Sequence, residues 1–150
     1  MTQPSVAKNP WVGFTFVVEI DGIQDARFTE CSGFEAKVEV EEYREGGLND
    51  YTHRLPGRRS FSTVTLKRGM VDSVELFDWL KRLAQKSDKT SETKNLSIVL
   101  YSLNATEAMR WNLVGAFPVK WSSPAMQTDQ SGVLFESLEL AFQELTFEKR

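Results

Sequence analysis

Residues 34–68 read FEAKVEVEEYREGGLNDYTHRLPGRRSFSTVTLKR, and two alternating runs within them decide the fold. Residues 34–41 alternate apolar and polar side chains, which is the two-residue period of a half-buried strand. In residues 63–67, Val64 and Leu66 share a face, and the β-branched residues of this run suit a pleated sheet. We therefore predict that the two runs pair as a long antiparallel hairpin whose apolar face meets a core.

The connection between these runs, residues 43–60, is much longer than the roughly 2 to 5 residues of an ordinary hairpin loop. Glycine and proline interrupt it, and its charges are sorted, with glutamates leading in and basic residues leading out. Two interpretations remain open at this point. The connection is either a solvated surface loop, which tolerates insertion, or a projecting arm that meets another chain.

Before this stretch, the alternation in residues 14–20 predicts a first strand, and Asp21-Gly22 is a hairpin-type turn signal. A short second strand around residues 26–29 is expected to pair with the first. Residues 1–12 are mostly polar and contain two prolines, so we expect a flexible N-terminal arm there.

After the stretch, apolar residues at helical spacing predict one amphipathic helix over residues 73–85, with Asp72 as its N-cap and Glu75 three residues later. Trp79 widens the apolar stripe. It is either a large side chain at the rim of the core or a helix interface with another subunit, and we assign it to the interface. The polar residues 86–94 are expected to form a mobile exposed loop.

Three further strands follow from alternation: residues 96–101, residues 111–121 with a bend at Gly115, and a long last strand that starts at Leu134. Strands that are half polar and joined by turns favour an antiparallel β-sandwich or barrel over a parallel sheet. We predict a mainly β fold with one flanking α-helix, as a single domain over residues 1–150.

The composition narrows the partners. The chain has 18 basic and 21 acidic residues, and this balance argues against nucleic acid or an anionic membrane as a partner. Cys31 is the single cysteine, so an internal disulfide is impossible, and we interpret it as a small buried residue. The sequence contains neither a classical signal peptide nor a membrane span, which predicts a soluble protein that is cytoplasmic at synthesis.

Residues for catalysis are scarce. His53 is the only histidine, so a cluster of histidine metal ligands is impossible and a serine hydrolase triad would depend on this one residue. Glu41 and Glu42 are consecutive in a predicted strand and point to opposite faces, so they cannot cooperate as acid and base. Nucleotide-binding, hydrolase and metalloprotease motifs are missing. We predict no enzymatic activity, no metal and no cofactor.

The order of motifs resembles the tail tube protein family of contractile phages and extracellular contractile injection systems. The resemblance covers residues 14–148. It rests on these segments in this order: FVVEIDG (16–22), CSGFEAKVEVEEYREGG (31–47), LPGR (55–58), VTLKRG (64–69), DSVELFDWL (72–80) and LFESLELAFQELTFE (134–148).

This resemblance implies six protomers in a ring, with rings stacked into a tube inside a sheath, and with strands from each protomer joining one barrel around the lumen. It also implies baseplate and tube-terminating proteins at the ends, protein or DNA cargo in the lumen, and a final place in a phage tail or injection particle. The implied contact arm between rings and neighbours contains Arg44, Glu45, Asp50, His53, Arg54, Arg58 and Arg59. The implied lumen-facing residues are Glu35, Lys37, Glu39, Thr63, Thr65, Lys67, Asn112, Ser137, Glu139 and Gln143.

Other functions remain open from the sequence. A related tube-initiating or baseplate-proximal subunit would share the motifs. A monomeric β-sandwich that binds a ligand such as carbohydrate would present its tryptophans as an exposed platform. A hydrolase effector is the least favoured, because it would depend on His53 alone.

Overall fold

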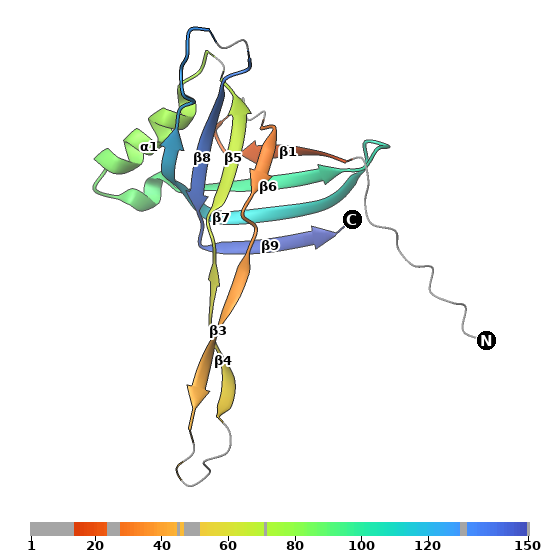
Figure 1. Ribbon diagram of the computed structural model, residues 1–150, viewed down its shortest axis with the longest axis vertical. Helices are drawn as coiled ribbons and strands as arrows, with labels where there is room; N and C mark the ends of the chain where they lie inside the picture. The colour runs from red at the N-terminus through yellow and green to blue at the C-terminus, as the bar shows by residue number, and fades with distance from the viewer. Residues whose placement is uncertain are drawn as a thin grey trace, which may run out of the picture.

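The computed structural model describes residues 14–23, 28–44, 46, 52–70, 72–129 and 132–149. Its strands are β1 (Thr15–Ile20), β2 (Glu30–Ser32), β3 (Ala36–Tyr43), β4 (His53–Phe61), β5 (Val64–Gly69), β6 (Lys94–Tyr101), β7 (Glu107–Ser122), β8 (Phe135–Ala141) and β9 (Glu144–Lys149). Helix α1 (Glu75–Gln85) and the short 3-10 helix η1 (Lys89–Glu92) lie between β5 and β6 (Figure 1). The predicted class, mainly antiparallel β with one flanking α-helix, is confirmed. The expected N-terminal arm, residues 1–12, lies outside the described residues.

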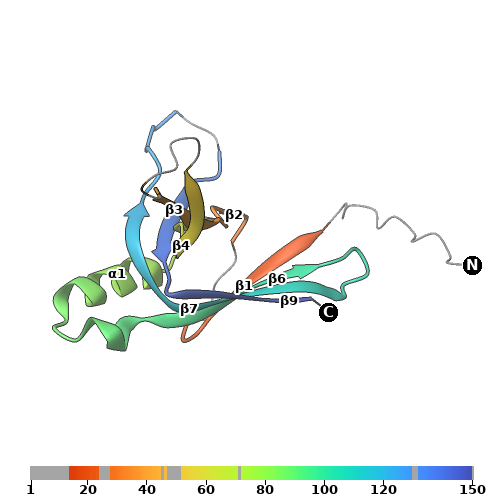
Figure 2. The same cartoon turned by 90° about the horizontal axis from the view of Figure 1, so that it is seen from below.

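Two sheets share the long strand β7. The first sheet has the order β1, β6, β7, β9, and the second has the order β7, β8, β5, β2. The first half of β7 pairs with β6 and β9, and its second half pairs with β8. Figure 2 shows β7 curving from one sheet into the other, with α1 beside its second half.

Gly115 marks the bend in β7. Its φ is +66°, a conformation that side chains with a Cβ rarely adopt, and its N–H donates to Oδ1 of Asn95 at 3.1 Å. The predicted bend is therefore confirmed. The chain also changes sheets between β8 and β9, at Phe142 and Gln143, so the prediction of one long last strand was wrong. The strand breaks because β9 pairs with β7 on the far side from β6.

The core lies between the inner faces of the two sheets and is closed by α1. Its buried side chains alternate along the strands, as the sequence pattern predicted. They are Val18, Ile20, Ile23, Phe28, Val64, Leu66, Leu76, Trp79, Leu96, Ile98, Leu113, Ala116, Leu138 and Leu140.

An ion pair lies within this core, and the sequence analysis did not predict it. Arg68 donates from Nε to Oε1 of Glu136 at 2.5 Å, and both side chains are at most 5% exposed. Trp121 donates from Nε1 to the other carboxylate oxygen at 2.9 Å, and the guanidinium lies over the ring of Phe28. These contacts satisfy charges that would be very costly to bury alone.

Helix α1 begins later than predicted. Val74 is its N-cap and makes no side-chain cap, while Oγ of Ser73 accepts a hydrogen bond from the Glu75 N–H at 3.4 Å. The prediction of Asp72 as the cap was therefore wrong. Trp79 is 0% exposed, and its indole N–H donates to the carbonyl oxygen of Glu92 at 2.7 Å. The assignment of Trp79 to a subunit interface was also wrong, because a fully buried side chain offers no surface to a second chain.

The segment expected to be a mobile exposed loop contains η1, which is tied to α1. The carboxylate of Glu92 is buried and accepts hydrogen bonds from Lys86 and from Arg82. Asp88 caps η1 by accepting from the Thr90 N–H. Hydrophilic composition indicated a loop, but the paired charges let this segment pack against the helix.

Glu92→Gln is expected to remove a part of the stability that depends on acid. The hydrogen bond from Lys86, and secondarily that from Arg82, lowers the pKa of Glu92. A lowered pKa contributes stability above the unfolded-state value of about 4.3, and this contribution is lost as the pH falls through the folded-state value. Denaturant titrations of wild type and variant should therefore differ at neutral pH and converge in acid. Glu144→Gln, an exposed carboxyl on β9, is the control. A difference that stays constant over pH would contradict the prediction.

Candidate functional site

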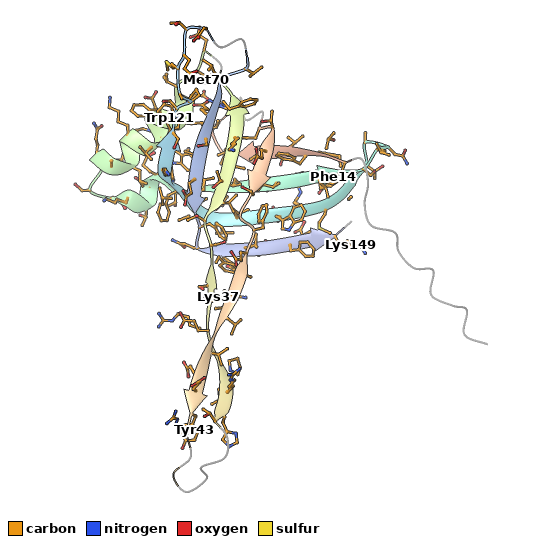
Figure 3. The ribbon with its side chains drawn as sticks, viewed as in Figure 1. Phe14, Lys37, Tyr43, Met70, Trp121 and Lys149 are labelled. Carbon is orange, nitrogen blue, oxygen red and sulfur yellow. The ribbon has the colours of Figure 1, made fainter. Side chains whose placement is uncertain are left out.

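The most conspicuous surface of the protein is a two-stranded arm formed by β3 and β4. Figure 1 shows it extending away from both sheets, and Figure 3 shows its side chains, with Lys37 nearer the base and Tyr43 nearer the tip. The strands pair from Ala36 opposite Phe61 to Tyr43 opposite His53. We use the word arm for these two strands from here on.

The sequence predicted this hairpin with the wrong partner. The return strand is β4, which comes from the segment expected to be a polar loop, whereas Val64–Gly69 forms β5 in the second sheet. A turn after Phe61 separates β4 from β5. The short strand expected near residues 26–29 is also displaced: β2 begins at Glu30 and pairs with β5, and residues 24–27 lie outside the described part of the chain.

One face of the arm is apolar and has no core to cover it. Val38 is 50% exposed and Val40 is 60% exposed, although their alternation predicted burial. Pro56 lies opposite Val40 on this face, and Phe61 lies at its base. The prediction that this face packs in the protomer core was therefore wrong. A two-stranded ribbon is marginally stable alone, so an exposed apolar face on one indicates a surface that another molecule covers.

The base of the arm is fixed to the body. The Ser62 hydroxyl donates to the Gly33 carbonyl at 2.8 Å, and the rings of Phe61 and Phe142 lie 5.5 Å apart. Gly33 has φ +97°, and a Cβ there would come within 2.4 Å of the Thr63 carbonyl oxygen. Only glycine fits this close approach of two backbones, so the arm leaves the body in one defined direction.

The expected contact residues are placed along the arm as follows. Arg44 is exposed at the end of β3, and His53 is the first residue of β4 rather than a loop residue. Arg54 lies 3.9 Å from Glu42 in an exposed ion pair, and Arg59 lies over the Phe61 ring. Arg58 is exposed on β4. Two more expected contact residues, Glu45 and Asp50, lie outside the described residues.

The expected lumen-facing residues do not share one surface. Glu35, Lys37 and Glu39 belong to the arm and its base. Asn112 lies in the first sheet, where it accepts a hydrogen bond from Ser97, and Gln143 packs against Gly115 at the bend. The prediction that all ten lie on one face was wrong, because β7 carries its two halves into different sheets.

Four of these residues do lie together, on the outward face of the second sheet. Thr65 is opposite Glu139, and Lys67 is opposite Ser137, on the neighbouring strands β5 and β8. Thr63, just before β5, donates from its hydroxyl to Glu139 at 2.6 Å. This face points away from the core, because the alternate residues of the same strands are buried.

Other features give little support for chemistry. A groove of about 530 Å³ between α1 and β7 is lined mainly by apolar residues, with Lys89 as its only charged lining residue. Burial raises the pKa of the Cys31 thiol to about 12, which suits the predicted role as a packed residue. Within the described residues, no group of three or more histidine, cysteine or acidic side chains is arranged to hold a metal. The described helices are too short and too polar to cross a membrane.

Comparisons with known proteins agree on one family. The family model of the T4-like virus tail tube protein gp19 matches residues 12–146. A search of the curated proteins finds no match. Among solved structures, the chain is similar to one in the sheath-tube complex of the extracellular contractile injection system PVC, with 25% identity, a TM-score of 0.80, and coverage of 96% of this chain and 95% of that one.

More distant structures share the fold. A chain of the tube terminating cap of the anti-feeding prophage has 22% identity and a TM-score of 0.80, with coverage of 99% of this chain and 97% of that one. Hcp1 from Flavobacterium johnsoniae has 11% identity and a TM-score of 0.53, with coverage of 90% and 95%. The arm and the polar sheet face are thus found on a scaffold that these solved structures share.

Proposed function

Because this chain belongs to the T4-like virus tail tube protein family and is a structural subunit of the inner tube of a phage tail or tail-like injection particle, we propose that six copies close into a ring and that rings stack into a hollow tube. The exposed apolar face of the arm carries this proposal. Stacked copies supply the surface that this face lacks within one protomer. A heterologous contact of this kind repeats without closing on itself, which builds a filament.

The partners of the tube follow from the same assignment. A sheath surrounds it, and baseplate and tube-terminating proteins hold its ends. The titles of the similar structures name a sheath-tube complex, a baseplate and a tube terminating cap, which supports this proposal. We expect copies to assemble in the cytoplasm before they become part of the particle.

The protein is proposed to act mechanically and to catalyse no reaction. The contracting sheath drives the rigid tube through an envelope, and protein or DNA cargo moves through the lumen. The polar face of the second sheet, with Thr65, Lys67, Ser137 and Glu139, is proposed to face that lumen. Short hydroxyl and charged side chains keep such a wall hydrated, so cargo slides past it instead of sticking.

Negative-stain electron microscopy of the purified protein over a range of concentrations tests the assembly. We expect six-fold rings or hollow tubes. Since nucleation on a template is slow without one, the same series should be repeated with short sheared tube fragments as seeds. Single copies under all conditions, with and without seeds, would overturn the proposal.

Reversing Arg58 and Arg59 to glutamate is expected to loosen ring stacking while the protomer stays folded. Both side chains are on the arm, far from the core, so the free energy of unfolding should change by about 0.5 kcal/mol or less. At a contact between rings, reversed charges oppose their partners instead of attracting them. Sedimentation should show tubes dissociating into rings at moderate salt.

Replacing both arginines by lysine is the matched control, because it keeps the charge, and tubes should persist. Tubes of unchanged length and salt resistance in the glutamate variant would count against the role of the arm in stacking.

A further inference from the structure

The outward face of the second sheet extends beyond the four residues already described. Strand register places two rows of side chains across its four strands. In order from β2 through β5 and β8 to β7, one row is Ser32, Thr65, Glu139 and Lys120, and the other is Glu30, Lys67, Ser137 and Ser122. We call these eight residues the wall face.

Charges on the wall face cancel over short distances. The Nζ atom of Lys67 lies 3.6 Å from a carboxylate oxygen of Glu30, on the neighbouring strand. Lys120 is directly opposite Glu139 across β7 and β8. Each row therefore holds one carboxylate and one ammonium as cross-strand neighbours, and the remaining side chains are small hydroxyls.

One large apolar side chain interrupts this polar surface. Phe135 is 45% exposed, and it lies opposite Gly69, one pair beyond the row that contains Lys67 and Ser137. Because it has the same parity along β8 as Ser137, it points to the same side of the sheet. The face thus combines compensated charge with one aromatic contact per copy.

We propose that the wall face is charge-compensated so that the tube conducts polypeptide cargo regardless of the sign of its net charge. This inference rests on the proposed function, in which the wall face lines the lumen. Opposite charges a few ångströms apart have fields that cancel well within the Debye length of about 10 Å at 0.1 M salt. A moving chain then meets no net attraction and no net barrier.

The same features disfavour a channel specialised for nucleic acid. Nucleic acid carries charge of one sign only, so a wall tuned to it gains from uniform acidity, which prevents phosphates from binding. Lys67 and Lys120 break such uniformity. Polypeptides carry both signs and apolar side chains, and they find counterparts in the paired charges and in Phe135.

Retention of short probes in purified tubes tests the inference. Fluorescent polyglutamate, polylysine and a short DNA duplex are incubated with tubes at low salt, the tubes are pelleted, and the retained probe is measured. Wild-type tubes should retain the two peptides equally and weakly. Glu30→Gln with Glu139→Gln leaves the lysines uncompensated, so retention of polyglutamate and DNA should rise roughly tenfold and vanish in high salt. Lys67→Gln with Lys120→Gln should do the same for polylysine.

Glu144→Gln with Glu148→Gln is the matched control, since it makes the same charge change on β9, in the first sheet. It should leave retention at the wild-type level. Tubes that form but retain one peptide preferentially without any substitution, or that respond equally to the control, would overturn the inference while leaving the tube function intact. Strong exclusion of DNA alone by wild-type tubes would also overturn it, in favour of an acidic channel. Failure to form rings or tubes would instead overturn the proposed function itself, and the inference with it.

Discussion

Glu136→Gln is expected to lower the free energy of unfolding by about 3 to 5 kcal/mol, the usual cost of breaking a buried ion pair by removing one partner. The substitution keeps the shape of the side chain and an oxygen that can accept from Trp121. It removes only the negative charge that compensates Arg68, whose side chain is 2% exposed. Chemical denaturation followed by tryptophan fluorescence measures the loss.

Two further variants separate charge burial from general disruption. Lys67→Gln removes the neighbouring residue of the same strand from an exposed pair with Glu30, and we expect a loss of less than about 1 kcal/mol. Arg68→Met with Glu136→Leu removes both charges, and it should recover much of the stability lost in the single variant. If Glu136→Gln costs no more than Lys67→Gln, the pair does not stabilise the core.

Replacing Val38 and Val40 by serine is expected to abolish tube assembly without unfolding the protomer. Both valines are at least half exposed in the single chain, so their loss removes little burial from the protomer fold. In a stacked tube the same methyl groups would be covered, and each buried methyl or methylene group contributes about 0.8 kcal/mol. Since every copy in a tube carries the substitution, the deficit is repeated at every contact.

Electron microscopy and the unfolding midpoint together decide this prediction. Lys37→Ser with Glu39→Ser changes the same strand on its opposite face and should leave assembly largely intact. The prediction fails if the serine variant forms tubes at the wild-type critical concentration. It also fails if the unfolding midpoint drops by several degrees, because the valines would then be part of the protomer core.

Local sequence patterns determined much of the fold. Alternation in residues 14–20 and in the run from Ala36 to Tyr43 identified β1 and β3, and the helical spacing identified α1 to within two residues at its start. The bend at Gly115 was predicted because a glycine inside a strand pattern has few other roles. These predictions hold because side-chain period and backbone preference are properties of neighbouring residues.

Pairings between distant strands required the tertiary structure. The sequence could not tell whether residues 36–43 pair with 53–61 or with 63–67, since both segments follow the same connection and β4 lacks clear alternation. Composition likewise concealed η1 and the ion pair of Arg68 and Glu136, because charged residues predict exposure unless their partners are known.

By itself, then, the sequence determined the class of fold, the order of most elements and the family, because these depend on local periodicity and motif order. Only the tertiary structure decided which surfaces are available for assembly. It buried Trp79, left Val38 and Val40 exposed on the arm, and divided the polar residues between two sheets. The physical reason is that alternation states only that a strand has an apolar face. Whether that face is covered by the same chain or by another copy depends on long-range packing, which no local pattern encodes.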